Sequence, residues 1–131
     1  MEEKDFCDKA LDHATERGAE YADVRLIPLS VSEDISVKNG VVENLEYSES
    51  AGFGVRVLLD GAWGFASSST LSEREVARVV DLAISIARAS VTTKQRAARL
   101  ASALIWKRAR YVSPVEIDPF RVSLEEKVDL L

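Results

Sequence analysis

The chain has 131 residues, of which 47% are hydrophobic and 30% are charged, as expected for one soluble domain with a modest core. Its net charge of −5 argues against nucleic acid as a partner. One Cys and one His cannot supply the three or four ligands of an ordinary zinc site, and no apolar run is long enough to cross a membrane.

The N-terminal segment predicts a helix over residues 3–17. Its apolar side chains recur at three- and four-residue spacing, which places Cys7 on the buried stripe and leaves His13 among charged neighbours in solvent. Gly18 is suited to end this helix. The first ten residues are too charged to resemble a secretion signal, so a cytoplasmic location is expected.

Residues 21–68 predict an antiparallel sheet of about five strands in hairpins. Asn39-Gly40 and Asp60-Gly61 are strong hairpin turns, and Pro28 indicates a sheet edge or the end of a strand. The carboxylates of the first hairpin are interpreted as its solvent-facing side. The predicted strands cover residues 21–29, 31–38, 41–49, 52–59 and 62–68, and these carboxylates are Glu33, Asp34, Glu43, Glu46 and Glu49.

Ser72 and Glu75 form a capping-box pattern that opens a second amphipathic helix, running to about residue 89. Hairpins flanked by two such helices predict an α+β domain over residues 1–90. We expect two layers, with both helices packed on one face of the sheet.

Residues 91–121 predict a linker or an extended arm. Pro114 and Pro119 exclude a continuous helix, the segment beyond about residue 104 favours an extended chain, and residues 92–103 stay open. The basic residues of 94–110 are compatible with a solvated linker or with a nucleic-acid patch, and the linker is preferred. A capping box at Ser123 opens a further helix, so residues 122–131 are interpreted as the start of a truncated helix from a following region.

A two-residue turn at Asp60-Gly61 sorts the side chains of the second hairpin by face. One face pairs large apolar residues with small ones and is the predicted core face. The other face is a candidate contact surface for a peptide or a partner, because it combines bare glycines, a charge and large rings, with Arg56 expected to stack on Phe65. Its candidate residues are Gly52, Gly54, Arg56, Trp63 and Phe65.

Four segments in order resemble the N-terminal region of the TldD/PmbA family, and TldD more closely than PmbA. They are Val37-Lys-Asn-Gly-Val-Val-Glu43, Gly52-Phe-Gly-Val-Arg-Val57, Gly61-Ala-Trp-Gly-Phe-Ala66, and Pro114-Val-Glu-Ile-Asp-Pro-Phe120 leading into Val122-Ser-Leu-Glu-Glu-Lys127. The resemblance covers nearly the whole chain.

The resemblance implies a cytosolic zinc-dependent peptidase, historically called a modulator of DNA gyrase, in which a TldD-type and a PmbA-type subunit form a heterodimer. The family's His-Glu-x-x-x-His helix and further Cys ligand belong to a C-terminal domain. That motif is missing here, since Ala14 follows His13. No catalytic or metal-binding residue of the family therefore carries over, and no cofactor is expected in this chain.

The leading hypothesis is a non-catalytic N-terminal domain of a TldD-like metallopeptidase, contributing to a cleft for unfolded peptide and to subunit contacts. Its expected partners are a C-terminal metallopeptidase domain, a TldD/PmbA-type subunit, or a second copy in a homodimer. The alternative is a stand-alone adaptor that uses the exposed sheet face for protein–protein interaction. Direct DNA binding is a third hypothesis, resting on residues 94–110 and the family's older name.

Overall fold

The computed structural model describes residues 2–102 and 109–131, and its fold class is α+β, as predicted. Its contacts divide the chain into unit 1 (residues 1–30 and 49–100) and unit 2 (residues 31–48 and 101–131). None of the helices in the described ranges is long and apolar enough to span a membrane. The elements are α1 (Glu3–Glu16), β1 (Tyr21–Lys38), β2 (Val41–Leu59), β3 (Ala62–Ser68), α2 (Glu73–Thr93), the 3-10 helix η1 (Pro119–Arg121) and α3 (Leu124–Leu130).

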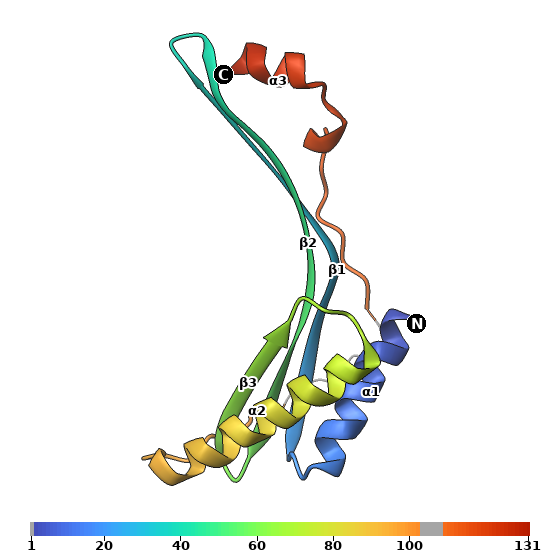
Figure 1. Cartoon of the computed structure of the whole chain (residues 1–131), viewed down its shortest axis with the longest axis vertical. Coiled ribbons are helices and arrows are strands. Elements are labelled where there is room, and N and C mark those ends of the chain that lie inside the picture. Colours follow the sequence, from blue (N-terminus) through green and yellow to red (C-terminus); the bar gives the residue numbers. More distant parts are fainter. Residues whose placement is uncertain (1, 103–108) are drawn as a thin grey trace. The chain divides into compact units, whose positions relative to one another are not determined.

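The sheet has three strands in the order β1-β2-β3, where the sequence predicted about five, and β1 and β2 are much longer than the 7-residue β3 (Figure 1). The expected breaks near residues 30 and 50 do not occur, so each of the first two strands is continuous. Pro28 is tolerated within β1 because this strand lies at a sheet edge, where a missing backbone donor need not interrupt the ladder. The predicted domain boundaries at residues 90 and 121 stay predictions.

The core of unit 1 lies between the sheet and two helices, α1 and α2, which lie side by side (Figure 1). This is the predicted two-layer arrangement. Alternate residues of β2 and β3 meet the apolar stripes of both helices, and the four largest fully buried side chains are valines of β2 and α2. Those valines are Val55, Val57, Val79 and Val80.

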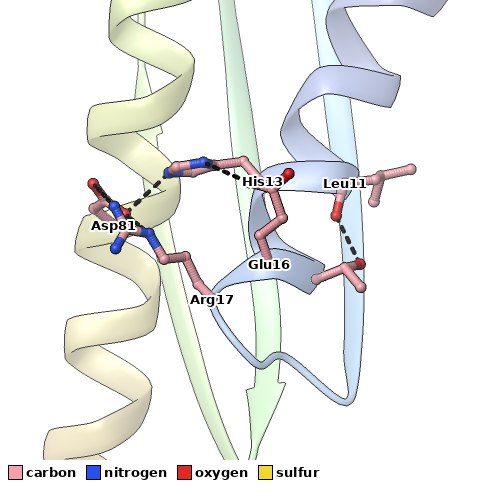
Figure 2. Close-up of polar contacts among 6 residues, drawn as sticks. Leu11, His13, Glu16, Arg17 and Asp81 are labelled. Atoms are coloured by element: carbon pink, nitrogen blue, oxygen red, sulfur yellow. Dashed lines mark hydrogen bonds and ion pairs between the residues drawn. The ribbon is translucent and has the colours of Figure 1, made fainter.

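Polar contacts hold α1 against α2 at the edge of this core. Asp81 on α2 accepts a hydrogen bond from His13 Nε2 at 3.1 Å and forms an ion pair with Arg17 Nε at 2.9 Å (Figure 2). His13 is thus half-buried between the helices, and the expectation of a simply solvated side chain is wrong. Gly18 then ends the region with a φ of 91°, as its predicted capping role requires.

The segment after α2 crosses the β2–β3 turn and forms what we call the turn clasp, residues 94–98. Ala98 N donates to Gly61 O at 2.8 Å, and Lys94 Nζ donates to Asp60 O. The Ala97 side chain packs so closely that a Cβ on Gly61 would lie 2.8 Å from it. Helix α2 ends at Thr93, which resolves part of the open segment 92–103, since residues 97–102 form neither helix nor strand.

Unit 2 combines the distal part of the β1–β2 hairpin with the C-terminal segment. The two-residue turn Asn39-Gly40 has positive φ at both positions, as predicted for this dipeptide. Helix α3 opens with the predicted capping box, in which Ser123 and Glu126 exchange side-chain and backbone hydrogen bonds. Lys127 on α3 pairs with Glu33 on β1, so Glu33 is half-buried and does not belong to the solvent-facing side.

The remaining described part of unit 2 is an arm. Residues 109–118 form neither helix nor strand, and the chain bends at residues 116–117 (Figure 1). The assignment of residues 91–121 as a linker or arm stays a prediction. The part of that prediction that concerns residues 104–108 lies outside the described residues.

Candidate functional site

The β2–β3 pairing has the register predicted from the Asp60-Gly61 turn. Leu59 pairs with Ala62, Val57 with Gly64, and the pairing continues to Phe53 with Ser68. Both turn residues have positive φ, the geometry of a two-residue hairpin loop. The core face therefore carries the large apolar residues of β2 against the small residues of β3, as expected.

Gly64 provides the close approach of α2 to this core face. A Cβ on Gly64 would lie 2.0 Å from the backbone oxygen of Ala83 and 2.6 Å from the nitrogen of Ala87. No side chain fits there, so the glycine sets the spacing between sheet and helix.

The opposite face of unit 1 carries a shallow hollow of about 510 Å³, which we call the strand-face hollow. It contains four of the five predicted contact residues, namely Gly52, Gly54, Arg56 and Phe65. Its lining also includes Asp23, Arg25 and Ile27 of β1, together with Ala51, Phe53, Ser67, Ser68 and Ser69. All of these residues belong to unit 1.

Gly54 gives Phe65 its place in the hollow. A Cβ on Gly54 would lie 2.9 Å from the Phe65 ring, so the ring lies across the bare backbone. The ring nevertheless stays 57% exposed. Gly52 lies against backbone instead of a side chain, since a Cβ on Gly52 would lie 3.0 Å from Ser68 O. Gly54 therefore provides the bare backbone that the exposed Phe65 ring covers, whereas Gly52 lies against the backbone of Ser68 and Ser69.

Arg56 contacts Trp63 and Asp23, so the predicted stacking on Phe65 is wrong. Its guanidinium lies 4.9 Å from the centre of the Trp63 ring, and its Nε and Nη2 donate to Asp23 Oδ2 at 2.8 and 2.6 Å. Hydrogen bonding and charge from Asp23 raise the pKa of Arg56 above its already high value. No pattern in the sequence pointed to Asp23, which reaches Arg56 from the neighbouring strand β1.

Trp63 lies beside the strand-face hollow, outside its lining. Its ring meets Tyr21 edge-on with centroids 6.0 Å apart, and it lines a second hollow of about 450 Å³ with residues of the turn clasp and the end of α2. Its register partner Leu58 is only 3% exposed, so this end of the outer face is better covered than the predicted pattern implied. The five predicted residues thus divide between two adjacent environments.

Metal-ligating side chains are dispersed in the part of the chain that the structure describes. No group of three or more His, Cys, Asp and Glu residues could hold a metal ion within those ranges. Cys7 is half-buried on α1, and burial raises the pKa of its thiol, with smaller contributions from the charges of Asp8 and Glu3. A raised thiol pKa disfavours the nucleophilic thiolate at neutral pH.

Comparison with known proteins shows which proteins this chain resembles. Residues 29–87 match the model of the PmbA/TldA metallopeptidase domain 1. The chain is 31% identical over 114 residues to a metalloprotease of Methanocaldococcus jannaschii, an alignment that covers 86% of this chain and 24% of that protein. The chain thus matches the first domain of the TldD/PmbA family.

A solved structure has a similar fold. The crystal structure of TldE from Thermococcus kodakarensis superposes with a TM-score of 0.59 and 14% sequence identity, covering 92% of this chain and 27% of that one. The chain thus spans about a quarter of the length of the relatives it matches, and the family match falls on the first domain. The finer preference for TldD over PmbA stays a prediction.

Proposed function

We propose that this chain is a non-catalytic first domain of a TldD-like metallopeptidase, and that it helps to hold an unfolded peptide substrate. The observation that carries the proposal is the strand-face hollow, in which the exposed Phe65 ring lies across the bare backbone at Gly54, on the sheet face opposite the helix layer. An exposed aromatic ring over bare backbone suits apolar peptide side chains without demanding one sequence.

The edge of the sheet supports the same function. In the described residues β3 is an edge strand, flanked only by β2, and it carries Phe65 and Ser67 of the hollow. Edge strands can bind an extended peptide through backbone hydrogen bonds, which are independent of side-chain identity. A peptide held there would lie next to the apolar part of the hollow.

In this proposal the zinc chemistry takes place outside this chain's residues. The described residues offer no three-ligand group, and the chain's one His is engaged between α1 and α2. The residues present therefore do not fit a zinc site, and we derive no catalytic step for this chain. Peptide hydrolysis in this proposal depends on a C-terminal metallopeptidase domain or a partner subunit.

Peptide binding tests the proposal directly. Fluorescence anisotropy of a labelled unfolded peptide should rise on adding the chain, and Phe65→Ala should weaken binding severalfold. The matched control is Ile86→Ala, because Ile86 is also an exposed apolar residue but lies on α2. Equal affinities for all three proteins would contradict the site. Stoichiometric zinc together with peptide cleavage by the chain alone would contradict the non-catalytic role.

The alternative function is a stand-alone adaptor, which the exposed apolar ring of Phe65 also supports. Light scattering with and without a full-length TldD/PmbA-type subunit distinguishes the two. Binding of the subunit without any peptide binding favours the adaptor, whereas peptide binding favours the cleft. A cytoplasmic location and the absence of nucleic-acid binding remain part of this proposal.

A further inference from the structure

The strand-face hollow contains one cation that no acid of its lining neutralises. Arg56 and Asp23 form an ion pair with each other, since Arg56 Nε and Nη2 both donate to Asp23 Oδ2. Arg25 lines the same hollow and is exposed, and its side chain has neither an ion pair nor a hydrogen bond with a residue that the structure describes. With two arginines and one aspartate as its ionisable residues, the lining carries a net charge of +1.

This spare charge lies in a hollow that also offers apolar surface. Ile27 follows two residues after Arg25 on the same side of β1 and is 46% exposed, and the Phe65 ring on β3 is 57% exposed. Between them the backbone of β2 is bare at Gly54. A ligand that complements such a lining combines an apolar side chain with one negative charge.

The width of the sheet sets the spacing between the charge and the ring. Arg25 and Phe65 belong to the two outer strands of the described sheet, with β2 between them. They lie at a similar level, because Arg56 pairs in register with Phe65 and contacts Asp23, two residues from Arg25. Neighbouring strands are about 4.8 Å apart, so the outer strands are roughly 10 Å apart. An extended peptide covers about 3.3 Å per residue, so this width corresponds to about three residues.

We propose that the strand-face hollow selects peptides in which an aspartate or glutamate lies about three residues from an apolar residue. The carboxylate pairs with Arg25, and the apolar side chain packs against Phe65. One spare guanidinium matches the single charge of a carboxylate, whereas a phosphoryl group carries about −1.5 to −2. The carboxylate belongs to a side chain, because a shallow hollow lets a peptide pass across it without enclosing a chain end. The inference rests on the proposed function and adds the substrate class and a specificity-determining residue.

The exposure of Arg25 limits how strong this preference is. An ion pair in contact with solvent contributes little, so one carboxylate should improve peptide affinity by about threefold to fivefold. Because dissolved ions screen exposed charges, the preference should disappear at about 1 M salt, whereas packing against Phe65 should persist.

Fluorescence anisotropy of short glycine/serine peptides, labelled at the N-terminus and amidated at the C-terminus, tests the preference. Each peptide carries one leucine and, three positions away in either direction, a glutamate, glutamine or lysine. The full chain should bind the glutamate peptide about threefold to fivefold more tightly than the glutamine peptide. Arg25→Gln should remove that difference and leave the affinity for the glutamine peptide unchanged. Arg25→Glu should transfer the preference to the lysine peptide.

Arg99→Gln is the matched control. Arg99 is an exposed arginine of unit 1 that lies outside the hollow, so this variant loses the same charge and should keep the full preference for glutamate. A loss of the preference in this control would assign it to the overall charge of the chain and overturn the role of Arg25.

Equal affinities for the glutamate and glutamine peptides overturn the inference, as does a preference that survives Arg25→Gln. Tighter binding of a phosphoserine peptide than of the glutamate peptide, or a gain that requires a free C-terminal carboxylate, also overturns it. In each of these cases peptide binding that depends on Phe65 leaves the proposed function standing. Absence of binding by every peptide contradicts both, so the two failures are distinguishable.

Discussion

Gly64 on β3 lies directly beneath the backbone carbonyl of Ala83 on α2, with no space for a side chain between them. A Cβ there would come within 2.0 Å of the carbonyl oxygen, which cannot move without shifting the helix. We expect Gly64→Ala to destabilise the fold by about 3 kcal/mol, as overpacking against backbone does. Urea unfolding measures the loss.

Gly54→Ala is the control for that change. Its new methyl group would meet the Phe65 ring at 2.9 Å, and this ring is exposed and can rotate away. Gly54→Ala should therefore cost less than about 1 kcal/mol. Similar losses for the two variants would show that strand propensity, rather than the helix contact, governs these glycines.

The second prediction concerns the aromatic pair that joins α1 to β2. Phe6 and Phe53 are buried, with ring centroids 4.8 Å apart in an edge-to-face arrangement. Phe6→Ala should cost about 3–5 kcal/mol, because it leaves a cavity in a small core, and Phe6→Leu should cost much less. Thermal unfolding of both variants checks the order. The result would be contradicted if the leucine variant were as unstable as the alanine one.

The third prediction is an acid dependence of stability from Glu75. Hydrogen bonds from Arg78 and Ser68 lower the pKa of Glu75 from 4.5 to about 2. Because the folded pKa is the lower one, ionised Glu75 stabilises the fold above the unfolded value, and that contribution is lost as the pH falls from about 4.5 toward 2. Melting temperatures measured across this window should fall more steeply for the native chain than for Glu75→Gln. Parallel profiles would contradict the assignment.

The fourth prediction is that Cys7 reacts slowly with thiol reagents at neutral pH. Burial raises the pKa of its thiol from 9.0, and the nucleophile is the thiolate. Reaction with a disulfide reagent should accelerate only as the pH rises above the ordinary thiol range. The same chain in guanidinium chloride is the control and should react faster at each pH. Rapid reaction of the native chain at pH 7 would indicate that α1 opens readily.

The fifth prediction isolates unit 2. Lys127 and Glu33 form an ion pair whose side chains are 16% and 23% exposed. Removing one partner leaves the other charge partly buried, so Lys127→Met should make the amides of α3 exchange about tenfold faster. Glu33→Gln together with Lys127→Met should cost less than the sum of the two single changes. Strict additivity in hydrogen exchange would mean that the pair contributes nothing to docking α3.

Local signals in the sequence predicted the parts of the fold that are set by nearby residues. The Asp60-Gly61 turn determines the whole β2–β3 register, and Ser123 and Glu126 determine where α3 begins. At Ser72 only half of the predicted capping box forms, because the Glu75 side chain turns toward Arg78 instead. A four-residue motif does not show that Arg78 competes with the Ser72 backbone for the Glu75 carboxylate.

Contacts between distant residues were the ones that the sequence could not predict. Asp23 meets Arg56 across 33 positions, and Lys127 meets Glu33 across 94. The predicted break in β1 was wrong for a related reason. Pro28 would interrupt a central strand but not an edge strand, and whether a strand lies at an edge depends on the assembled sheet. The sequence thus predicted which sheet face carries the hollow, but it did not predict that Arg56 contacts the ring of Trp63.

Three structural requirements meet at one glycine of the hairpin that the turn clasp contacts. Gly61 must adopt a φ of 70° to close the hairpin, must accept a hydrogen bond from Ala98, and must leave room for Ala97. The chain beyond α2 is consequently anchored at the hairpin tip, several residues past the end of the helix. Residue 98 is therefore held by a turn that lies 37 positions earlier in the chain (61 to 98), so a substitution at Gly61 would loosen residues 94–98 as well as the hairpin.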